Sequence, residues 1–348
     1  MGDRVLLNVL SVAYPLLPVN ADSAGGAEQI LYLLERELVR LGCQSTVIAA
    51  EGSRVHGRLI PTPTYGIEIT EVTRRDAHRI HREAIEDALA SNSFDLIHFH
   101  GLDFNTYFPS TCIPKVATLH LPPSWYSSDT FLLPDVHLSC VSRSQAESAN
   151  ACTQQLSVVV NGVDTEAYTV GSNTRDHLLW IGRICPEKGV HLALETAHAL
   201  DLPVFVAGPV HPFREHQQYF QNQVVPLLDE NRQYIGAVSL EQKIDLLSRA
   251  RALLIPSLAA ETSSLVAMEA MSSGTPVIAF RNGALPEVIE DGVTGFVVDN
   301  IEEMKAAVLK LAQITATACR TRAVTHFSSR RMAEDYLNLY KRVIDAWR

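Results

Sequence analysis

Two glutamates separated by seven residues are the first feature of this sequence that could do chemistry. An apolar, strand-like run ends at Ser257, a loop with Glu261 follows, and a helical pattern with Glu269 begins near Ser264. The first amides of a helix lack intrahelical partners and carry the positive end of its dipole, so this helix start suits a phosphate. With Glu261 on the loop and Glu269 in the helix, the two carboxylates can reach opposite ends of one ligand. Thr262 or Ser263 is expected as the N-cap.

Two cations follow another apolar run. Arg183 and Lys188 come directly after the strand-like residues 177–181 and before a second helical pattern. They suit a diphosphate, because arginine contacts two phosphate oxygens at once and lysine acts as a point charge. Gly25 and Gly26, before the first helical pattern, would let the backbone approach a phosphate or sugar closely, although a Gly-Gly pair is also common in plain turns.

The elements that must position these residues alternate along the whole chain between short apolar runs and helix-periodic segments. This alternation predicts α/β domains with parallel sheets covered by helices. Strands are expected at residues 6–12, 45–49, 96–99, 115–119, 136–141, 156–160, 177–181, 204–207, 252–255, 276–279 and 295–298. Helices are expected at residues 27–41, 190–200, 240–248, 265–272 and 330–347.

The length of 348 residues and one polar segment predict two domains. Residues 164–176 are polar and unpatterned, which indicates a link. We expect an N-terminal domain at 1–165, a second domain at 175–328 and a final helix at 329–348. Two doubly wound parallel sheets would face a central cleft, with ligands at the carboxyl ends of the strands.

Composition and charge exclude several classes of protein. The net charge of −10 argues against a general nucleic-acid binder. Six scattered cysteines and the lack of any run of roughly 20 apolar residues predict a cytoplasmic protein without disulfides. Residues 54–82 hold six of the eleven positive charges among residues 1–170. A solvated helix face is the simpler interpretation, and a peripheral membrane contact is the alternative.

Other patterns bear on dehydrogenase, P-loop and metal chemistry. The sequence has neither a G-x-G-x-x-G after the first strand nor a G-x-x-x-x-G-K-[ST], which disfavours a nicotinamide dehydrogenase and a P-loop enzyme. His98 and His100 alternate on a strand and so point to one side, as metal ligands could, with His120 or Asp103 as the third. We interpret them as structural and expect no metal.

In their order along the chain, these motifs resemble the retaining glycosyltransferases of family 4, which have the GT-B architecture. The resemblance covers almost the whole chain and is most specific over residues 252–299. Its matching segments are residues 25–28 (GGAE), 118–120 (TLH), 161–164 (NGVD), 182–183 (GR), 187–189 (EKG), 207–209 (AGP), 261–269 (E-x7-E), 274–277 (GTPV), 283–287 (GALPE) and 291–295 (DGVTG).

The resemblance implies a donor and a reaction. A sugar would pass with retention from a UDP- or GDP-linked sugar to an acceptor hydroxyl, by a front-face mechanism that needs no metal or other cofactor. Arg183 and Lys188 would bind the diphosphate of this nucleotide sugar, and Glu269 would hold the ribose hydroxyls. Glu261 would contact the transferred sugar.

The resemblance assigns the remaining site residues as well. The amides of Ser264 and Leu265 would lie near the phosphate and sugar, Gly25 and Gly26 would close over the diphosphate, and His120 would lie beside the anomeric centre. The final helix, 329–348, would pack back on the N-terminal domain.

One departure from the family pattern affects specificity. Ser263 and Ser264 stand where the family usually has an aromatic residue and a glycine, so the donor sugar is left open. The acceptor could be a sugar, a lipid-linked compound or a small molecule. A sugar-nucleotide epimerase, a phosphorylase-like enzyme and a catalytically silent nucleotide-sugar-binding protein are the alternatives.

Overall fold

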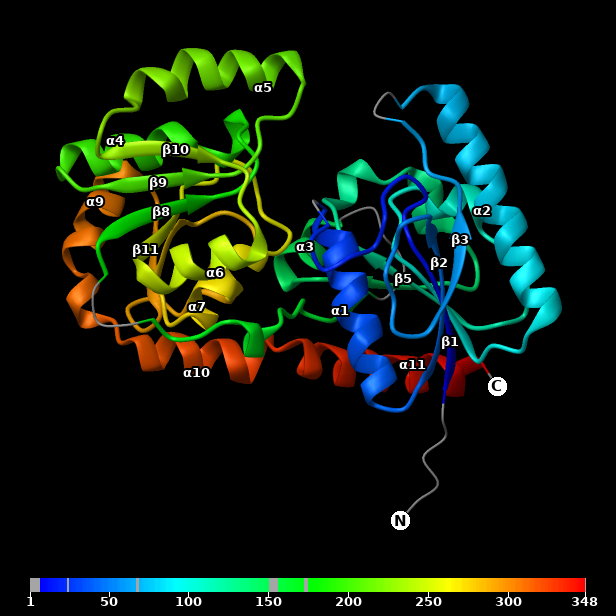
Figure 1. Ribbon diagram of the computed structural model, residues 1–348. Helices are drawn as coiled ribbons and strands as arrows, with labels where there is room; N and C mark the ends of the chain where they lie inside the picture. The colour runs from blue at the N-terminus through cyan, green and yellow to red at the C-terminus, as the bar shows by residue number, and fades with distance from the viewer. Residues whose placement is uncertain (1–6, 24, 67–68, 150–155, 172–174, 348) are drawn as a thin grey trace. The chain divides into compact units, whose positions relative to one another are not determined.

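The computed structural model arranges most of the chain in two compact units. The described residues are 7–23, 25–66, 69–149, 156–171 and 175–347. Unit 1 comprises Met1–Gly162 together with Ser329–Arg348, and unit 2 comprises Val163–Ser328. Each is built on a parallel β-sheet with helices against it (Figure 1), which confirms the predicted fold class.

The sheet of unit 1 has seven strands within the described residues, in the order β3-β2-β1-β4-β5-β6-β7, and all its pairings are parallel. The strands are β1 Asn8–Val12, β2 Gln44–Ala50, β3 Arg58–Thr62, β4 Leu96–Phe99, β5 Lys115–Leu119, β6 His137–Cys140 and β7 Ser157–Val158. The helices are α1 Gly26–Arg40, α2 Glu71–Ser91, α3 Arg143–Ser148 and α11 Ser329–Trp347. In β1 and β4 almost every residue is buried, as expected where both faces of a parallel sheet are covered.

The sheet of unit 2 has six strands within the described residues, in the order β10-β9-β8-β11-β12-β13, again all parallel. The strands are β8 His177–Ile181, β9 Val204–Ala207, β10 Arg232–Gly236, β11 Ala250–Ile255, β12 Val277–Phe280 and β13 Gly295–Val298. The helices are α4 Val190–Ala199, α5 Arg214–Tyr219, α6 Leu240–Arg249, α7 Leu265–Ser272, α8 Leu285–Val288, α9 Ile301–Leu309 and α10 Ala316–Phe327. Strands β8 and β11 are neighbours, so the loops that follow them leave the same edge of the sheet.

The C-terminal helix α11 belongs to the core of unit 1. It packs along α1, and its Tyr336 and Tyr340 are fully buried. The hydroxyl of Tyr340 lies 2.7 Å from His98 Nδ1, and that of Tyr336 lies 2.8 Å from the Thr118 hydroxyl. The sheet and the last helix are therefore joined by buried hydrogen bonds as well as apolar contact.

Two strands escaped sequence prediction, and both lie at a sheet edge. Strand β10 alternates buried or half-buried residues with exposed ones, and β3 is only partly buried and contains Pro61, which an edge position tolerates. Continuous apolar runs indicate strands whose two faces are both covered. They do not reveal partly exposed edge strands such as β3 and β10. The expected strand start at residue 6 lies outside the described residues.

The predicted link over residues 164–176 is anchored over its first half. One Nη of Arg320, on α10, donates to the carbonyls of Thr165 and Tyr168 at 2.6 and 2.9 Å, and the Tyr168 side chain is buried. These residues therefore pack within unit 2. Residues 172–174, at the centre of the predicted link, lie outside the described residues.

Five cysteines of the described residues are free thiols, and Cys152 lies outside that part of the chain. None of the described helices combines the length and apolar character that a membrane span requires. On α2, Arg79 of the positively charged stretch forms ion pairs with Asp76 and Glu83.

Candidate functional site

The loop between β8 and α4 carries both predicted diphosphate ligands. Arg183 is exposed directly after the strand, and Lys188 ends a short turn of 3-10 helix, Pro186–Lys188. Gly189 then starts α4 with a φ of 65°, and a Cβ there would lie 2.1 Å from the Pro256 carbonyl oxygen. Glycine is thus required where this loop passes the end of β11.

Lys188 forms an ion pair with Glu261, which lies 73 positions away in the sequence. The Lys188 Nζ is 2.6 Å from Glu261 Oε1, and the Ser257 hydroxyl donates to the same oxygen at 2.7 Å. The two loops are also joined through the backbone, because the amide of Leu258 donates to the Glu187 carbonyl at 2.8 Å. One predicted diphosphate ligand and the predicted sugar ligand are therefore brought together.

The backbone of Glu261 is fixed by the loop that follows β12. Its carbonyl accepts from the amide of Ala284 at 2.8 Å, and it forms a bridge with Gly283. Gly283 has a φ of 59°, and a Cβ there would lie 2.2 Å from the Glu261 carbonyl oxygen. This glycine allows the close approach that holds Glu261 in place.

The start of α7 differs in detail from the prediction. Ser264 is the N-cap, where Thr262 or Ser263 was expected, and its side chain makes no capping hydrogen bond. The Ser263 hydroxyl is buried and finds no hydrogen-bond partner among the described residues. The helix begins at Leu265, so its first amides are not capped by the Ser264 hydroxyl and remain suited to an anion.

Glu269, one turn into α7, is held by two residues that the sequence did not single out. Lys243 of α6 places its Nζ 2.6 Å from Glu269 Oε1, and the Tyr168 hydroxyl also bonds to this carboxylate. Burial, followed by the charge of Glu269, raises the pKa of Tyr168. Lys243 lies within an amphipathic helix and Tyr168 within a polar segment, so neither had a sequence pattern that marked it.

Unit 1 places the predicted glycines at the start of α1. Gly25 is the N-cap, and a Cβ there would lie 1.9 Å from Glu28 Oε2. Glu28 is buried in the first turn of the helix, and this burial raises the pKa of its carboxyl group. Because Gly25 and Gly26 have no side chains, they leave space at the start of α1. The buried carboxylate of Glu28 occupies part of that space.

His120 follows β5 and belongs to a buried group of rings in unit 1. Its Nε2 lies 3.0 Å from His100 Nδ1, and its backbone amide donates to the Tyr126 hydroxyl at 2.8 Å. Burial lowers the pKa of His120 to about 4, so its imidazole is neutral near pH 7. The Nδ1 of His98 lies 2.7 Å from the Tyr340 hydroxyl, and its Nε2 lies 2.7 Å from the Thr118 hydroxyl.

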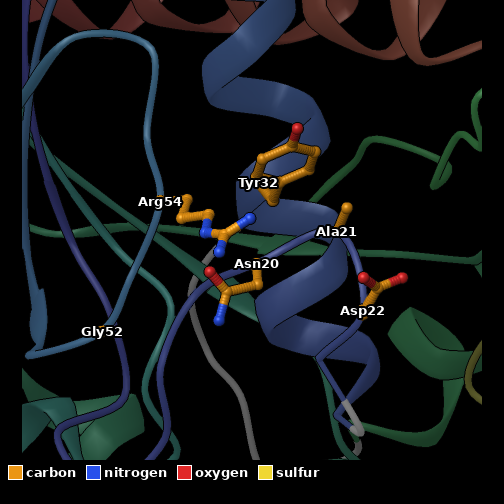
Figure 2. Close-up of a pocket in the computed structure, with 6 residues that line it drawn as sticks. All are labelled: Asn20, Ala21, Asp22, Tyr32, Gly52 and Arg54. Atoms are coloured by element: carbon orange, nitrogen blue, oxygen red, sulfur yellow. The ribbon is translucent and has the colours of Figure 1, made fainter.

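A small hollow lies beside α1 in unit 1, with a volume of about 310 Å³ (Figure 2). It is lined by Asn20, Ala21, Asp22, Tyr32, Gly52 and Arg54. These come from the loop before α1, from α1 itself and from the loop after β2. The predicted site residues do not line it, so the hollow does not bear on their roles.

Comparison with known proteins decides the family. The model of the family described as Glycosyl transferases group 1 matches residues 175–313, and the model described as Glycosyltransferase Family 4 matches residues 24–167. The chain is a family 4-type GT-B glycosyltransferase. The first model covers most of unit 2, which holds Arg183, Lys188, Glu261 and Glu269, and the second covers most of the contiguous part of unit 1.

Curated relatives agree with this family. An uncharacterized glycosyltransferase of Methanocaldococcus jannaschii is 25% identical over 265 residues, which cover 68% of this chain and 69% of that protein. A D-inositol 3-phosphate glycosyltransferase of Mycobacterium sp. (strain KMS) is 31% identical over 221 residues, 57% of this chain. The match spans about half the length of that mycobacterial enzyme, 49%.

Solved structures share the fold of this glycosyltransferase. A sucrose-phosphate synthase from Thermosynechococcus elongatus superimposes with a TM-score of 0.80 at 18% identity, covering 97% of this chain and 100% of that one. AviGT4, a glycosyltransferase involved in avilamycin A biosynthesis, gives 0.73 at 23% identity, with coverage of 97% and 98%. Anabaena HepE in complex with UDP and glucose gives 0.74 at 15% identity, with 96% and 99% covered.

Proposed function

We propose that this glycosyltransferase transfers a hexose, with retention of anomeric configuration, from a UDP- or GDP-linked sugar to an acceptor hydroxyl. The reaction would need no metal ion. The observation that carries the proposal is the ion pair between Lys188 and Glu261, which brings a predicted diphosphate ligand and a predicted sugar ligand into contact. The complex of Anabaena HepE with UDP and glucose supports a UDP-linked hexose as the first donor to test.

The diphosphate would bind to the cations of the β8–α4 loop and to the start of α7. Arg183 is exposed beside this loop and can contact two phosphate oxygens, while Lys188 supplies a point charge. The α7 amides add donors and the positive end of a helix dipole. These groups would stabilise the charge that grows on the leaving diphosphate, the role that a divalent cation has in metal-dependent transfer.

The two glutamates would hold the two ends of the donor. Glu269 uses one carboxylate oxygen for Lys243 and has lone pairs left for the ribose hydroxyls. Glu261 is fixed at its backbone by the Gly283 loop, and its carboxylate would accept from hydroxyls of the transferred sugar. A donor that engages Lys188 would compete with Glu261 for this ammonium group and so loosen the ion pair.

The transfer step follows from this arrangement. The bond between the anomeric carbon and the diphosphate oxygen breaks as the acceptor oxygen forms its bond on the same face of the sugar. The acceptor proton passes to the departing phosphate oxygen, so the step needs no protein base. His120 would act as a neutral hydrogen-bonding partner of a sugar hydroxyl, and Gly25 and Gly26 would bind the diphosphate through their backbone.

The acceptor is proposed as a class only. The acceptor hydroxyl would belong to a sugar, a lipid-linked compound or a small molecule, and the name of the mycobacterial relative adds a phosphorylated polyol to that panel. Peripheral contact with a membrane surface would accompany a lipid-linked acceptor. We place the reaction in the cytoplasm. Nucleotide sugars are available there, and its reducing conditions suit the five free thiols of the described residues.

A donor panel tests the proposal directly. UDP- and GDP-linked glucose, galactose, mannose and N-acetylglucosamine are each added to the protein, and the melting temperature is measured. The best donor is then incubated with the acceptor panel, and the product linkage is read by NMR. We expect one donor to raise the melting temperature and the product to keep the donor's anomeric configuration. An inverted product would refute the retaining mechanism, and the lack of any donor-dependent shift would refute the donor class.

A further inference from the structure

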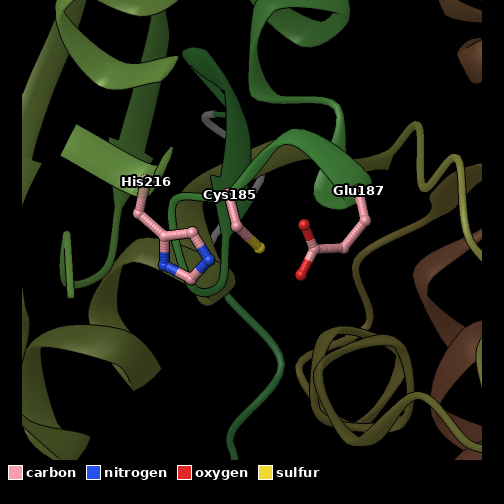
Figure 3. A group of neighbouring side chains, drawn as sticks. All are labelled: Cys185, Glu187 and His216. Carbon is pink, nitrogen blue, oxygen red and sulfur yellow. The ribbon is translucent and has the colours of Figure 1, made fainter. Parts of the chain in front are cut away.

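Three side chains of unit 2 that have no part in the proposed transfer converge on one point (Figure 3). Cys185 and Glu187 flank the start of the short 3-10 turn after β8, and His216 lies on α5. One ligand atom of each side chain lies within 4.8 Å of the others. The Cys185 sulfur lies between the imidazole and the carboxylate in Figure 3.

The Cys185 and Glu187 side chains are hydrogen-bonded to each other. Cys185 is fully buried, and its Sγ lies 3.4 Å from the Arg183 carbonyl. His216 is half-buried, and its Nδ1 is shielded from solvent without a hydrogen-bond partner among the described residues. A buried imidazole nitrogen without a partner is unfavourable, and a bound cation would satisfy it.

We propose that Cys185, Glu187 and His216 form a binding site for Zn²⁺. Sulfur, imidazole nitrogen and carboxylate oxygen are the three ligand types that zinc takes in proteins, at distances of about 2.0 to 2.3 Å. Ligand atoms around a tetrahedral zinc ion are therefore about 3.3 to 3.8 Å apart. The three ligand atoms lie within 4.8 Å of one another, so a bound zinc ion would draw them closer by at most about 1.5 Å.

The ligand set also selects the ion. Mg²⁺ and Ca²⁺ prefer oxygen ligands, whereas this group offers one thiol, one imidazole and a single carboxylate. Three protein ligands leave the fourth zinc position for water. The other described cysteine of unit 2, Cys319, bonds to the Thr294 carbonyl and is not part of the group.

A zinc ion bound at this site would stabilise the conformation of the β8–α4 loop. A bound ion joins this loop to α5, and the loop also carries Arg183 and Lys188, which are not among the ligands. Zinc would therefore hold the loop backbone and stabilise unit 2, without taking part in sugar transfer. The inference goes beyond the proposed transferase activity and can be tested without any sugar donor.

The experiment measures metal binding to the intact chain. The protein is stripped with a chelator, and its zinc affinity and stoichiometry are found by competition with a chromophoric zinc indicator. Co²⁺ is then added as a spectroscopic probe, because a thiolate bound to cobalt gives a charge-transfer absorption in the near ultraviolet. Variants Cys185→Ser and His216→Gln remove one ligand each. Cys112→Ser and His326→Gln, at exposed positions outside the group, are the matched controls.

We expect one zinc ion per chain, the cobalt–thiolate band, and a loss of affinity of about tenfold or more in both ligand variants. The two controls should bind as the wild type does. Zinc should raise the melting temperature of the wild type and of the two controls, but not that of the two ligand variants. Because His216 is half-buried on a short helix, His216→Gln provides a folded variant even where Cys185→Ser perturbs the core.

Other results would overturn the proposal. Equal affinity in the wild type and in His216→Gln would mean adventitious binding, as would loss of binding in Cys112→Ser. A cobalt complex without the thiolate band would exclude Cys185 as a ligand. None of these results depends on sugar transfer, so they leave the proposed function untouched.

Discussion

At the scale of single residues, the two glutamates of unit 2 differ in what holds them. Glu269 is bound by Lys243, and Glu261 by Lys188. We expect Glu269→Ala to weaken binding of the nucleoside diphosphate about tenfold or more, because hydrogen bonds to a charged group contribute about 1.5 to 3 kcal/mol. Glu261→Ala should keep that affinity and lose turnover. Isothermal titration calorimetry with UDP and GDP, together with initial rates, measures both effects.

The control for this pair is Glu302→Ala, which removes an exposed carboxylate of α9 that pairs with Lys305 on the surface. It should leave both the affinity and the rate unchanged. If Glu269→Ala binds the nucleotide as tightly as the wild type, the ribose role of Glu269 is wrong.

The cations of the donor loop lead to a prediction about metal ions. If Arg183, Lys188 and the start of α7 neutralise the diphosphate, EDTA should leave the initial rate of transfer unchanged. Arg183→Ala should lower kcat/KM about a hundredfold, because an arginine contacts two phosphate oxygens at once, which Lys188 does not. Rates measured with EDTA and after re-addition of Mg²⁺ or Mn²⁺ check this. A rate abolished by EDTA and restored by one of these ions would contradict metal independence.

The buried histidines of unit 1 predict how stability depends on pH. Burial lowers the pKa of His120 to about 4, below its ordinary value of 6.5, and lowers that of His98 and His100 as well. Unfolding exposes these rings, which then take up protons as the pH falls below 6.5. Stability should therefore decrease between pH 6.5 and about 4, by about 2 kcal/mol at pH 5 for one such group.

Urea denaturation of the protein at pH 7.5, 6 and 5 measures this dependence. His120→Gln should flatten the curve, even if it lowers the stability at every pH. An unchanged slope in the variant would show that His120 does not remain neutral in the folded protein.

At the scale of elements, the glycine after β12 positions Glu261. A Cβ at Gly283 would meet backbone atoms of Glu261 at 2.2 and 2.5 Å. We expect Gly283→Ala to displace the Glu261 segment, lower stability by about 2 kcal/mol or more, and reduce turnover. Gly292 is the matched control, since its φ of 74° is similarly positive but no atom lies within 4 Å of the added Cβ.

Gly292→Ala should therefore show only the conformational cost of a positive φ, about 1 to 2 kcal/mol. Thermal unfolding and initial rates of the two variants separate conformational strain from displacement. Equal losses of stability and unchanged turnover in both would mean that the contact with Glu261 has no functional consequence.

The elements also indicate which parts of the fold and site were accessible from the sequence. Strands with two covered faces, such as β4 and β11, consist mostly of apolar residues, and Gly189 marks the loop that follows β8. Edge strand β3 is half exposed and has no such run. Motif spacing identified Glu261, whereas Lys243 is brought to Glu269 only by the packing of α6 on α7. Contacts of this kind depend on tertiary structure, and no local pattern encodes them.

At the scale of the whole molecule, the two units differ in how the chain builds them. Unit 2 is one continuous segment, Val163–Ser328, whereas unit 1 needs the last helix, α11, in addition to the first part of the chain. The α11 side chains Met332, Tyr336 and Tyr340 are fully buried. Arg331 of this helix also donates to the carbonyls of Val160 and Asn161 at 2.8 Å. Unit 1 is therefore complete only when α11 is present.

This arrangement predicts unequal effects of truncation. Deleting residues 329–348 exposes the apolar face that α11 covers, and each large side chain lost there costs about 1.5 to 3 kcal/mol. Summed over the large buried side chains of α11, this loss is comparable with the whole stability of an ordinary domain, so unit 1 should unfold. Unit 2 should stay folded, and it should still bind the nucleoside diphosphate, because Arg183, Lys188 and Glu269 all lie within it. Lys341→Ala, an exposed position on the same helix, is the control and should unfold as the wild type does. Limited proteolysis followed by mass spectrometry, with and without UDP, measures the outcome. A protected fragment near residues 163–328 would support the prediction. Protection of residues 7–162 in the truncated chain would contradict it.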